Sequence, residues 1–180
     1  MRVAIWAMQY TLGVIDAPKV ARKALQGFRG RRESWLEESC AEWFPKYVLP
    51  EVQQAGRRAV KAHREAGDFV AIVTGATRYV AEPVAAELGV PNVICSELEI
   101  DVEGCFTGQI VEPLCYGLGK VERTAKVAER EGFRLEESTF YSDSITDLPL
   151  LEVVEAPIVI NPDRRLRKIA EKRGWPIEVW

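Results

Sequence analysis

The chain has 180 residues, of which 47% are hydrophobic and 28% charged, and it carries a formal net charge of −3 at pH 7. This length supports one hydrophobic core with at most a small subdomain, and the net negative charge argues against electrostatic binding to nucleic acid or a membrane surface. The four cysteines show no CxxC or Cys/His spacing, which argues against a zinc site or a disulfide framework and favours a reduced cytoplasmic location. The first 12 residues are apolar, but they are too few to span a bilayer and lack a basic start and a cleavage site.

The first third of the chain is predicted to be helical throughout residues 1–66. Ser34 opens a pattern with Trp35, Leu36, Cys40 and Trp43 at helical spacing. Residues 51–65 follow Pro50, repeat with a helical period and end at a glycine. We therefore divide the chain into a helical, cap-like segment over residues 1–50 and a core over residues 51–180.

Residues 69–160 alternate between strands and helices. Helices are predicted over 77–88, 119–131, 147–154 and 163–173, and strands over 69–74, 92–95, 138–141, 157–160 and 177–180. A hairpin-like excursion pairs 97–102 with 105–111. Strands separated by helices of this length predict an α/β fold, with a three-layer Rossmann-like parallel sheet covered by helices on both faces.

The stretch from residue 140 to residue 151 carries the clearest chemical signal. Asp143 and Asp147 follow a short buried strand, in a loop that turns into a helix. Carboxylates at the carboxyl end of a parallel strand suit a hard cation such as Mg²⁺. Asp147 has a simpler alternative role as the cap of the next helix, because Pro149 follows in its first turn.

Two upstream positions suit a phosphate group. Thr74 ends a buried strand next to Gly75, where a hydroxyl and backbone amides can hold phosphate oxygens, although a threonine there can equally cap the following helix. Lys120 opens a helix after glycines, where a cation opposes the helix dipole and so favours a nearby anion. The alternative for Lys120 is an ordinary solvated lysine.

Taken in order, a threonine, a lysine and two aspartates resemble motifs II, III and IV of the haloacid dehalogenase superfamily, most closely its phosphoserine-phosphatase-like subfamily IB. The resemblance extends from about residue 51 to residue 180. It implies that Thr74, Gly75 and Lys120 bind the phosphoryl group of a small phosphorylated substrate. It also implies that Asp143 ligates Mg²⁺ or another divalent cation, with Asp147 supporting the metal site.

The family's motif I, Asp-x-Asp-Gly-Thr on the first strand, has no counterpart in the sequence. One interpretation aligns residues 4–12 with that strand, which places Ala7 and Gln9 where the family has its nucleophile and its acid. The other interpretation, which we favour, makes residues 3–12 a helix that resembles the start of the family's cap. The first strand is then absent, and the chain is truncated or degenerate at its N-terminal end.

This interpretation has a consequence for assembly. In the family the first strand lies between the strands that end here at Thr74 and Tyr141, so its loss would leave both neighbours with unpaired edges. Five aromatic residues of the N-terminal helices either fill a cap core or form a subunit interface: Trp6, Tyr10, Trp35, Trp43 and Phe44. We predict a homodimer, with exchange of helices between subunits as one possible form.

Two functions remain open from the sequence. The first is a metal-dependent phosphoric-ester hydrolase that lacks the usual aspartate nucleophile and uses a water activated by the metal. The second is an inactive remnant that binds phosphate or serves as a dimeric scaffold. His63 is interpreted as a surface residue, and Cys115 as a small buried hydrophobe rather than a nucleophile.

Overall fold

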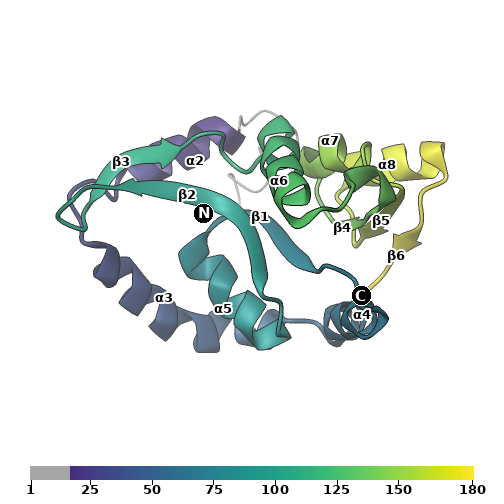
Figure 1. Cartoon of the computed structure of the whole chain (residues 1–180), viewed down its shortest axis with the longest axis horizontal. Coiled ribbons are helices and arrows are strands. Elements are labelled where there is room, and N and C mark those ends of the chain that lie inside the picture. Colours follow the sequence, from purple (N-terminus) through teal and green to yellow (C-terminus); the bar gives the residue numbers. More distant parts are fainter. Residues whose placement is uncertain (1–16) are drawn as a thin grey trace.

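The computed structural model describes residues 17–180 (Figure 1). Its helices are α2 (Ala17–Gln26), α3 (Glu33–Tyr47), α4 (Gln54–Ala66), α5 (Arg78–Leu88), α6 (Leu118–Glu131), α7 (Leu148–Leu151) and α8 (Arg164–Arg173). Its strands are β1 (Ala71–Thr77), β2 (Asn92–Ile100), β3 (Phe106–Val111), β4 (Thr139–Ser142), β5 (Ala156–Ile160) and β6 (Ile177–Glu178). The helical prediction is confirmed for most of residues 17–66. Both interpretations of residues 3–12, and the roles of Trp6 and Tyr10, concern residues outside the described part.

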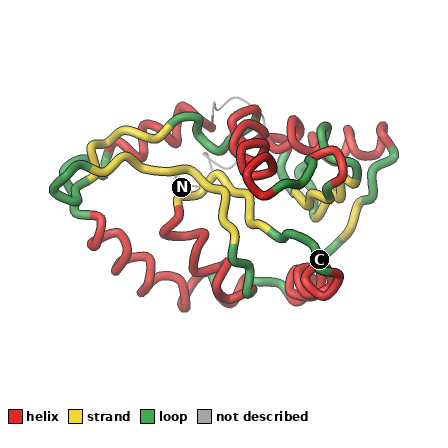
Figure 2. Tube along the Cα trace, viewed as in Figure 1, coloured by secondary structure: helices red, strands yellow, loops and turns green. Residues whose placement is uncertain are grey.

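The strands form two separate three-stranded sheets, which appear as two groups of yellow segments in Figure 2. In the first, β1 pairs with β2 in parallel and β2 pairs with β3 in antiparallel orientation. In the second, β4, β5 and β6 are all parallel. The predicted α/β architecture with parallel strands and packed helices is therefore confirmed. Within residues 17–180, no strand lies between β1 and β4.

The main differences from the sequence prediction concern β2, β1 and the segment before α7. The segment predicted as two strands, 92–95 and 97–102, is the single strand β2, because its first half pairs with β1 and its second half with β3. Strand β1 continues past Thr74 to Thr77, with a register break after Val73. The helix predicted over 147–154 is a 3₁₀ turn, Ile145–Asp147, followed by the short helix α7.

The two sheets have separate cores. Around β2 and β3, Leu36, Tyr79, Leu98 and Phe106 pack together and bring α3 and α5 onto the sheet. Glu33 of α3 fastens this contact, because it accepts a hydrogen bond of 2.8 Å from the Tyr79 hydroxyl and pairs with Arg78. Around β4 and β5, the buried residues come from α6, α7, α8 and β5 itself: Ala128, Leu150, Leu151, Val159, Leu166 and Ala170. The boundary at residue 50 stays a prediction.

Helix α3 presents aromatic side chains to the surface. Trp35, Trp43 and Tyr47 are exposed, although Trp35 also touches Phe28 and Trp43 stacks on Tyr47. These contacts are local, so a subunit interface on this helix remains a prediction. Among the described residues, no helix has both the length and the apolar character needed to cross a membrane.

Candidate phosphate and metal site

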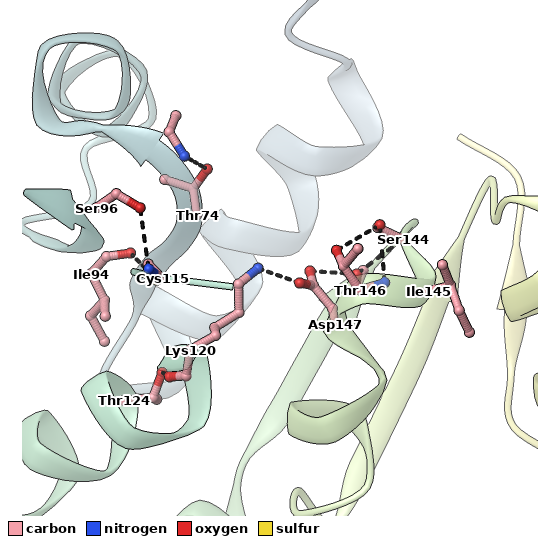
Figure 3. Close-up of polar contacts among 12 residues, drawn as sticks. Thr74, Ile94, Ser96, Cys115, Lys120, Thr124, Ser144, Ile145, Thr146 and Asp147 are labelled. Atoms are coloured by element: carbon pink, nitrogen blue, oxygen red, sulfur yellow. Dashed lines mark hydrogen bonds and ion pairs between the residues drawn. The ribbon is translucent and has the colours of Figure 1, made fainter. Parts of the chain in front are cut away.

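A buried ion pair lies where β1 and β4 end (Figure 3). Lys120 sits in the first turn of α6, which follows Gly117, a glycine with a positive φ of 52°. Its Nζ lies 2.6 Å from Oδ1 of Asp147, and the two residues are only 4% and 8% exposed. The interpretation of Lys120 as a solvated lysine is therefore wrong. Its ammonium is held inside the protein, at the carboxyl ends of the strands.

Asp147 is held in place by a second contact that the sequence did not indicate. Its Oδ2 accepts a hydrogen bond of 2.8 Å from the hydroxyl of Ser142, the buried last residue of β4. Asp147 precedes α7, but its side chain makes no capping hydrogen bond there, so the helix-cap interpretation is wrong. The sequence feature that could have identified Ser142 is its position directly before Asp143, the first of the paired aspartates.

The loop between β4 and α7 is shaped by Asp163, which the sequence analysis also missed. The Asp163 carboxylate accepts a hydrogen bond of 2.7 Å from the Ile145 amide and also caps α8. The Asp163 amide donates to the backbone oxygen of Asp143 at 2.9 Å. The sequence feature that could have identified Asp163 is its position directly before a helix. Together these bonds fix the backbone of the loop that presents Asp143.

The Asp143 side chain is the free carboxylate of this loop. It is exposed, and within residues 17–180 it makes no hydrogen bond or ion pair with another side chain or amide. Its carboxylate is carried by a loop whose backbone is fixed. Asp143 can bind a cation without breaking any side-chain hydrogen bond or ion pair within residues 17–180.

Thr74 and Gly75 lie on the other side of Lys120. The Thr74 hydroxyl accepts a hydrogen bond of 3.1 Å from the amide of Ala76. The N-cap of α5 is Thr77, so the interpretation of Thr74 as a helix cap is wrong. A side chain at Gly75 would lie 2.4 Å from the ring of Tyr116, so glycine is required for this ring to pack against β1. Phosphate binding by Thr74 and Gly75 stays a prediction.

Cys115 is buried close to Lys120. It is 0% exposed, its thiol contacts the backbone oxygen of Ile94 at 3.6 Å, and its amide donates to Ser96. Burial raises the pKa of the Cys115 thiol, against the opposing effect of nearby Lys120. The interpretation of Cys115 as a buried hydrophobe is therefore confirmed, and the thiol stays protonated at neutral pH.

We expect the two buried cysteines to resist alkylation in the folded protein. Burial, followed by the charge of Glu97, raises the pKa of Cys95 to about 11. At pH 8 its thiolate fraction is then only about one in a thousand, and the thiolate is the reactive form. Iodoacetamide should modify the half-buried Cys40 and Cys105 first, and Cys95 and Cys115 only after denaturation. Peptide mass spectrometry gives the order, and early labelling of Cys115 would contradict its burial.

His63 is more constrained than the sequence suggested. Its Nδ1 lies 2.7 Å from Asp68, and its Nε2 lies 2.9 Å from the hydroxyl of Tyr141. The side chain is 30% exposed, so His63 lies at the surface, as interpreted, but it is held by two partners there. Both ring nitrogens are occupied, and His63 ties α4 to β4.

The side-chain oxygens of this site suit a cation that needs few protein ligands. Within residues 17–180, no three His, Cys, Asp or Glu side chains are grouped closely enough to enclose a metal ion. Asp143 offers free oxygens, whereas Lys120 and Ser142 occupy the oxygens of Asp147. Mg²⁺ is commonly held by one or two carboxylates together with water and substrate phosphate. The site therefore fits such an ion through Asp143, and the described side chains alone do not form an all-protein cage around it.

Comparisons with known proteins show which family the chain resembles. The family model for haloacid dehalogenase-like hydrolases matches residues 2–152. A histidinol-phosphatase of Neisseria meningitidis is 30% identical over 171 residues, covering 93% of this chain and 77% of that protein. A phosphoserine phosphatase of Mycobacterium tuberculosis is 35% identical over 162 residues, covering 90% of this chain and 52% of that protein. The chain thus spans only about half the length of several curated relatives.

A solved structure is similar along almost the whole chain. A protein of unknown function from Bordetella pertussis superimposes with a TM-score of 0.86 at 32% identity, covering 98% of this chain and 80% of the other. The family match covers most of the sequence, and the neisserial relative is matched over more than two thirds of its length. The chain belongs to the haloacid dehalogenase-like hydrolase family.

Proposed function

We propose that this chain hydrolyses small phosphate esters in a site formed by Thr74, Gly75, Lys120, Asp143 and Asp147, with help from a divalent cation. Support comes from the family and from relatives that are named as phosphatases of small phosphorylated metabolites. The observation that carries the proposal is the buried ammonium of Lys120 at the carboxyl ends of β1 and β4.

The Lys120 ammonium has capacity left for an anion. It carries three N–H donors, and among the described residues its one ionic partner is Asp147. Burying a cation is costly unless it is paired and hydrogen-bonded, so a second anion at this point is favourable. A phosphoryl oxygen beside Nζ would accept a hydrogen bond from the Lys120 ammonium. The Thr74 hydroxyl would donate to the same phosphoryl group from the opposite side.

Mg²⁺, or another divalent cation, would be held by Asp143. When bound, such an ion neutralises phosphate charge and lowers the pKa of bound water. Asp147 would act through Lys120, whose ammonium it orients and partly neutralises. Attack by water, without a phosphorylated aspartate, remains our hypothesis for the hydrolytic step.

The test is turnover of a generic aryl phosphate monoester and of the corresponding diester by metal-stripped protein before and after reloading with Mg²⁺. We expect monoester hydrolysis only after reloading, and competition by inorganic phosphate. Absence of turnover together with saturable phosphate binding would favour the second candidate, a phosphate-binding protein without catalysis. The lack of a grouped set of three metal-binding side chains within residues 17–180 is the observation in its favour.

We also propose that the chain forms a homodimer through the aromatic face of α3, including a form with exchanged helices. Trp43 is 42% exposed and Tyr47 is 64% exposed, and exposed aromatic side chains are typical anchors of interfaces. Trp43→Ala is then expected to raise the dimer dissociation constant at least tenfold, measured by sedimentation equilibrium. Glu42→Ala on the same helix is the control. A monomer at micromolar concentration in the wild type would refute the dimer.

A further inference from the structure

Helix α6 carries a second cation close to Lys120. Arg123 lies three residues further along the helix, and its side chain is only 12% exposed. Residues three positions apart on a helix are neighbours on its surface, so the two side chains leave adjacent parts of α6. Figure 3 shows that Lys120 reaches from α6 to Asp147. Two of the three hydrogen-bond partners of Arg123 lie instead at the chain segment that precedes α6.

The Arg123 guanidinium makes three short contacts. Its Nε donates to the backbone oxygen of Pro113 and its Nη2 to the backbone oxygen of Val111, each at 2.6 Å. Its Nη1 pairs with the Glu97 carboxylate, also at 2.6 Å. Glu97 and Val111 face each other in the ladder between β2 and β3. One planar group therefore joins α6 to the end of this hairpin and to the segment that leaves it.

Residues 112–117, which we call the linker, connect β3 to α6 and support its first turn. The Lys120 amide donates to the backbone oxygen of Gly117 at 3.1 Å. A side chain at Gly119 would collide with the backbone oxygen of Leu114, so the first turn of the helix lies directly on the linker. The position of the linker backbone therefore sets the point from which the Lys120 side chain starts.

Arg123 is the contact that holds the linker at Pro113. Within residues 17–180, no backbone amide donates to the Pro113 oxygen, so the Arg123 guanidinium satisfies it. A guanidinium carries its donors in a rigid planar fork, whereas a lysine ammonium is a compact charge on a flexible stem. Arg123 thus fixes two carbonyl groups in relation to α6. Such precision matters at a reacting group, because a displacement of about 1 Å can cost on the order of 100-fold in rate.

We propose that Arg123 is a positioning residue for Lys120: by fastening the linker to α6, it sets the place of the Lys120 ammonium opposite Asp147. Its own hydrogen bonds go to the linker and the hairpin, so it acts through Lys120. The contact with Glu97 contributes less, because that carboxylate is 52% exposed. The consequence for hydrolysis rests on the proposed function, whereas the placement of the ammonium does not.

The test measures proton exchange of the Lys120 ammonium by its ¹⁵Nζ NMR signal, in protein without metal or phosphate. Lys120 is 4% exposed and paired with Asp147, so its protons are shielded from exchange with water. Loss of the signal in Lys120→Met assigns it. Arg123→Lys keeps a positive charge beside Glu97 but loses the fork, so we expect exchange at least tenfold faster than in the wild type.

Two variants serve as controls for this measurement. Glu97→Gln removes the ion pair but keeps both carbonyl contacts of Arg123, so exchange at Lys120 should match the wild type. Arg130→Lys changes an exposed arginine on the same helix, paired only with Glu131, and should also leave exchange unchanged. A purely structural role of the Arg123 charge would instead give equal acceleration in Arg123→Lys and Glu97→Gln.

Turnover gives a second readout. In Arg123→Lys we expect kcat for an aryl phosphate to fall at least tenfold and inorganic phosphate to bind at least tenfold more weakly. The affinity for Mg²⁺ should stay that of the wild type, because Asp143 lies in the loop after β4. A wild type without turnover and without phosphate binding would refute the proposed function, and the exchange rates would still decide the role of Arg123.

Gly119→Ala displaces the linker independently, because the added Cβ pushes against the Leu114 oxygen while Arg123 is unchanged. Exchange at Lys120 should again be at least tenfold faster, which keeps the test decisive if Arg123→Lys does not fold. Thermal unfolding shows which variants fold. An unchanged exchange rate in either folded variant, or equal acceleration in Glu97→Gln, overturns the proposal. Loss of folding in both variants also overturns it, because Arg123 would then support the whole fold rather than Lys120.

Discussion

Replacing Lys120 with methionine is expected to lower the free energy of unfolding by about 3–5 kcal/mol, the range typical of breaking a buried ion pair. Lys120 and Asp147 have side chains that are only 6% and 11% exposed, with 2.6 Å between their charged atoms. Methionine keeps the length of the side chain, so the loss comes mainly from leaving the Asp147 carboxylate without its cation. Urea unfolding monitored by circular dichroism measures this change.

A double-mutant cycle separates the ion pair from the packing. Asp147→Asn removes the charge but can still accept the Ser142 hydrogen bond. In the Lys120→Met/Asp147→Asn double variant no charge is buried, so we expect a coupling free energy of about 2 kcal/mol or more. The control is Lys126→Met on the same helix, because Lys126 forms an exposed pair with Glu122 and should contribute at most about 0.5 kcal/mol. Additive effects of the two site substitutions would show that the pair does not stabilise the fold.

Local sequence signals predicted most elements but not their pairing. Gly67, Gly89, Gly132 and Gly174 each end a helix in a left-handed conformation, and each helix end fell near its predicted position. Strand β2 was divided in the prediction, because its polar second half, from Ser96 onward, reads as a hairpin. Only the tertiary structure shows that this one strand pairs with β1 in parallel and with β3 in antiparallel orientation.

The candidate site was predicted by residue type but not by contact. The order of Thr74, Lys120, Asp143 and Asp147 predicted their membership of the site, because each was expected to end a strand, follow one or open a helix. The Lys120–Asp147 pair joins residues far apart in the sequence, and no local pattern encodes such a contact. The same limit applies to Asp163, which appears to local analysis as an N-cap only, yet also holds the loop of Asp143.

Replacing Asp143 with asparagine is expected to lower metal-dependent phosphate ester hydrolysis by about 10²–10³-fold. A metal ion supplies several kcal/mol of transition-state stabilisation, and each 1.36 kcal/mol corresponds to a factor of ten in rate. Stability should change by less than about 0.5 kcal/mol, because Asp143 is exposed and makes no side-chain contact within the described part of the chain. The variant therefore separates loss of function from loss of folding, which Lys120→Met cannot do.

Metal binding gives this prediction a readout that does not depend on turnover. Calorimetric titration with Mg²⁺, or Mn²⁺ as a spectroscopic substitute, should show one site in the wild type and at least a tenfold weaker one in Asp143→Asn. Glu129→Gln, an exposed carboxylate on α6 away from the ion pair, is the matched control and should bind the metal as the wild type does. Equal metal affinity in Asp143→Asn and wild type would remove Asp143 from the metal site. Because Lys120 and Ser142 already occupy the oxygens of Asp147, the described loop would then offer no free carboxylate to take its place.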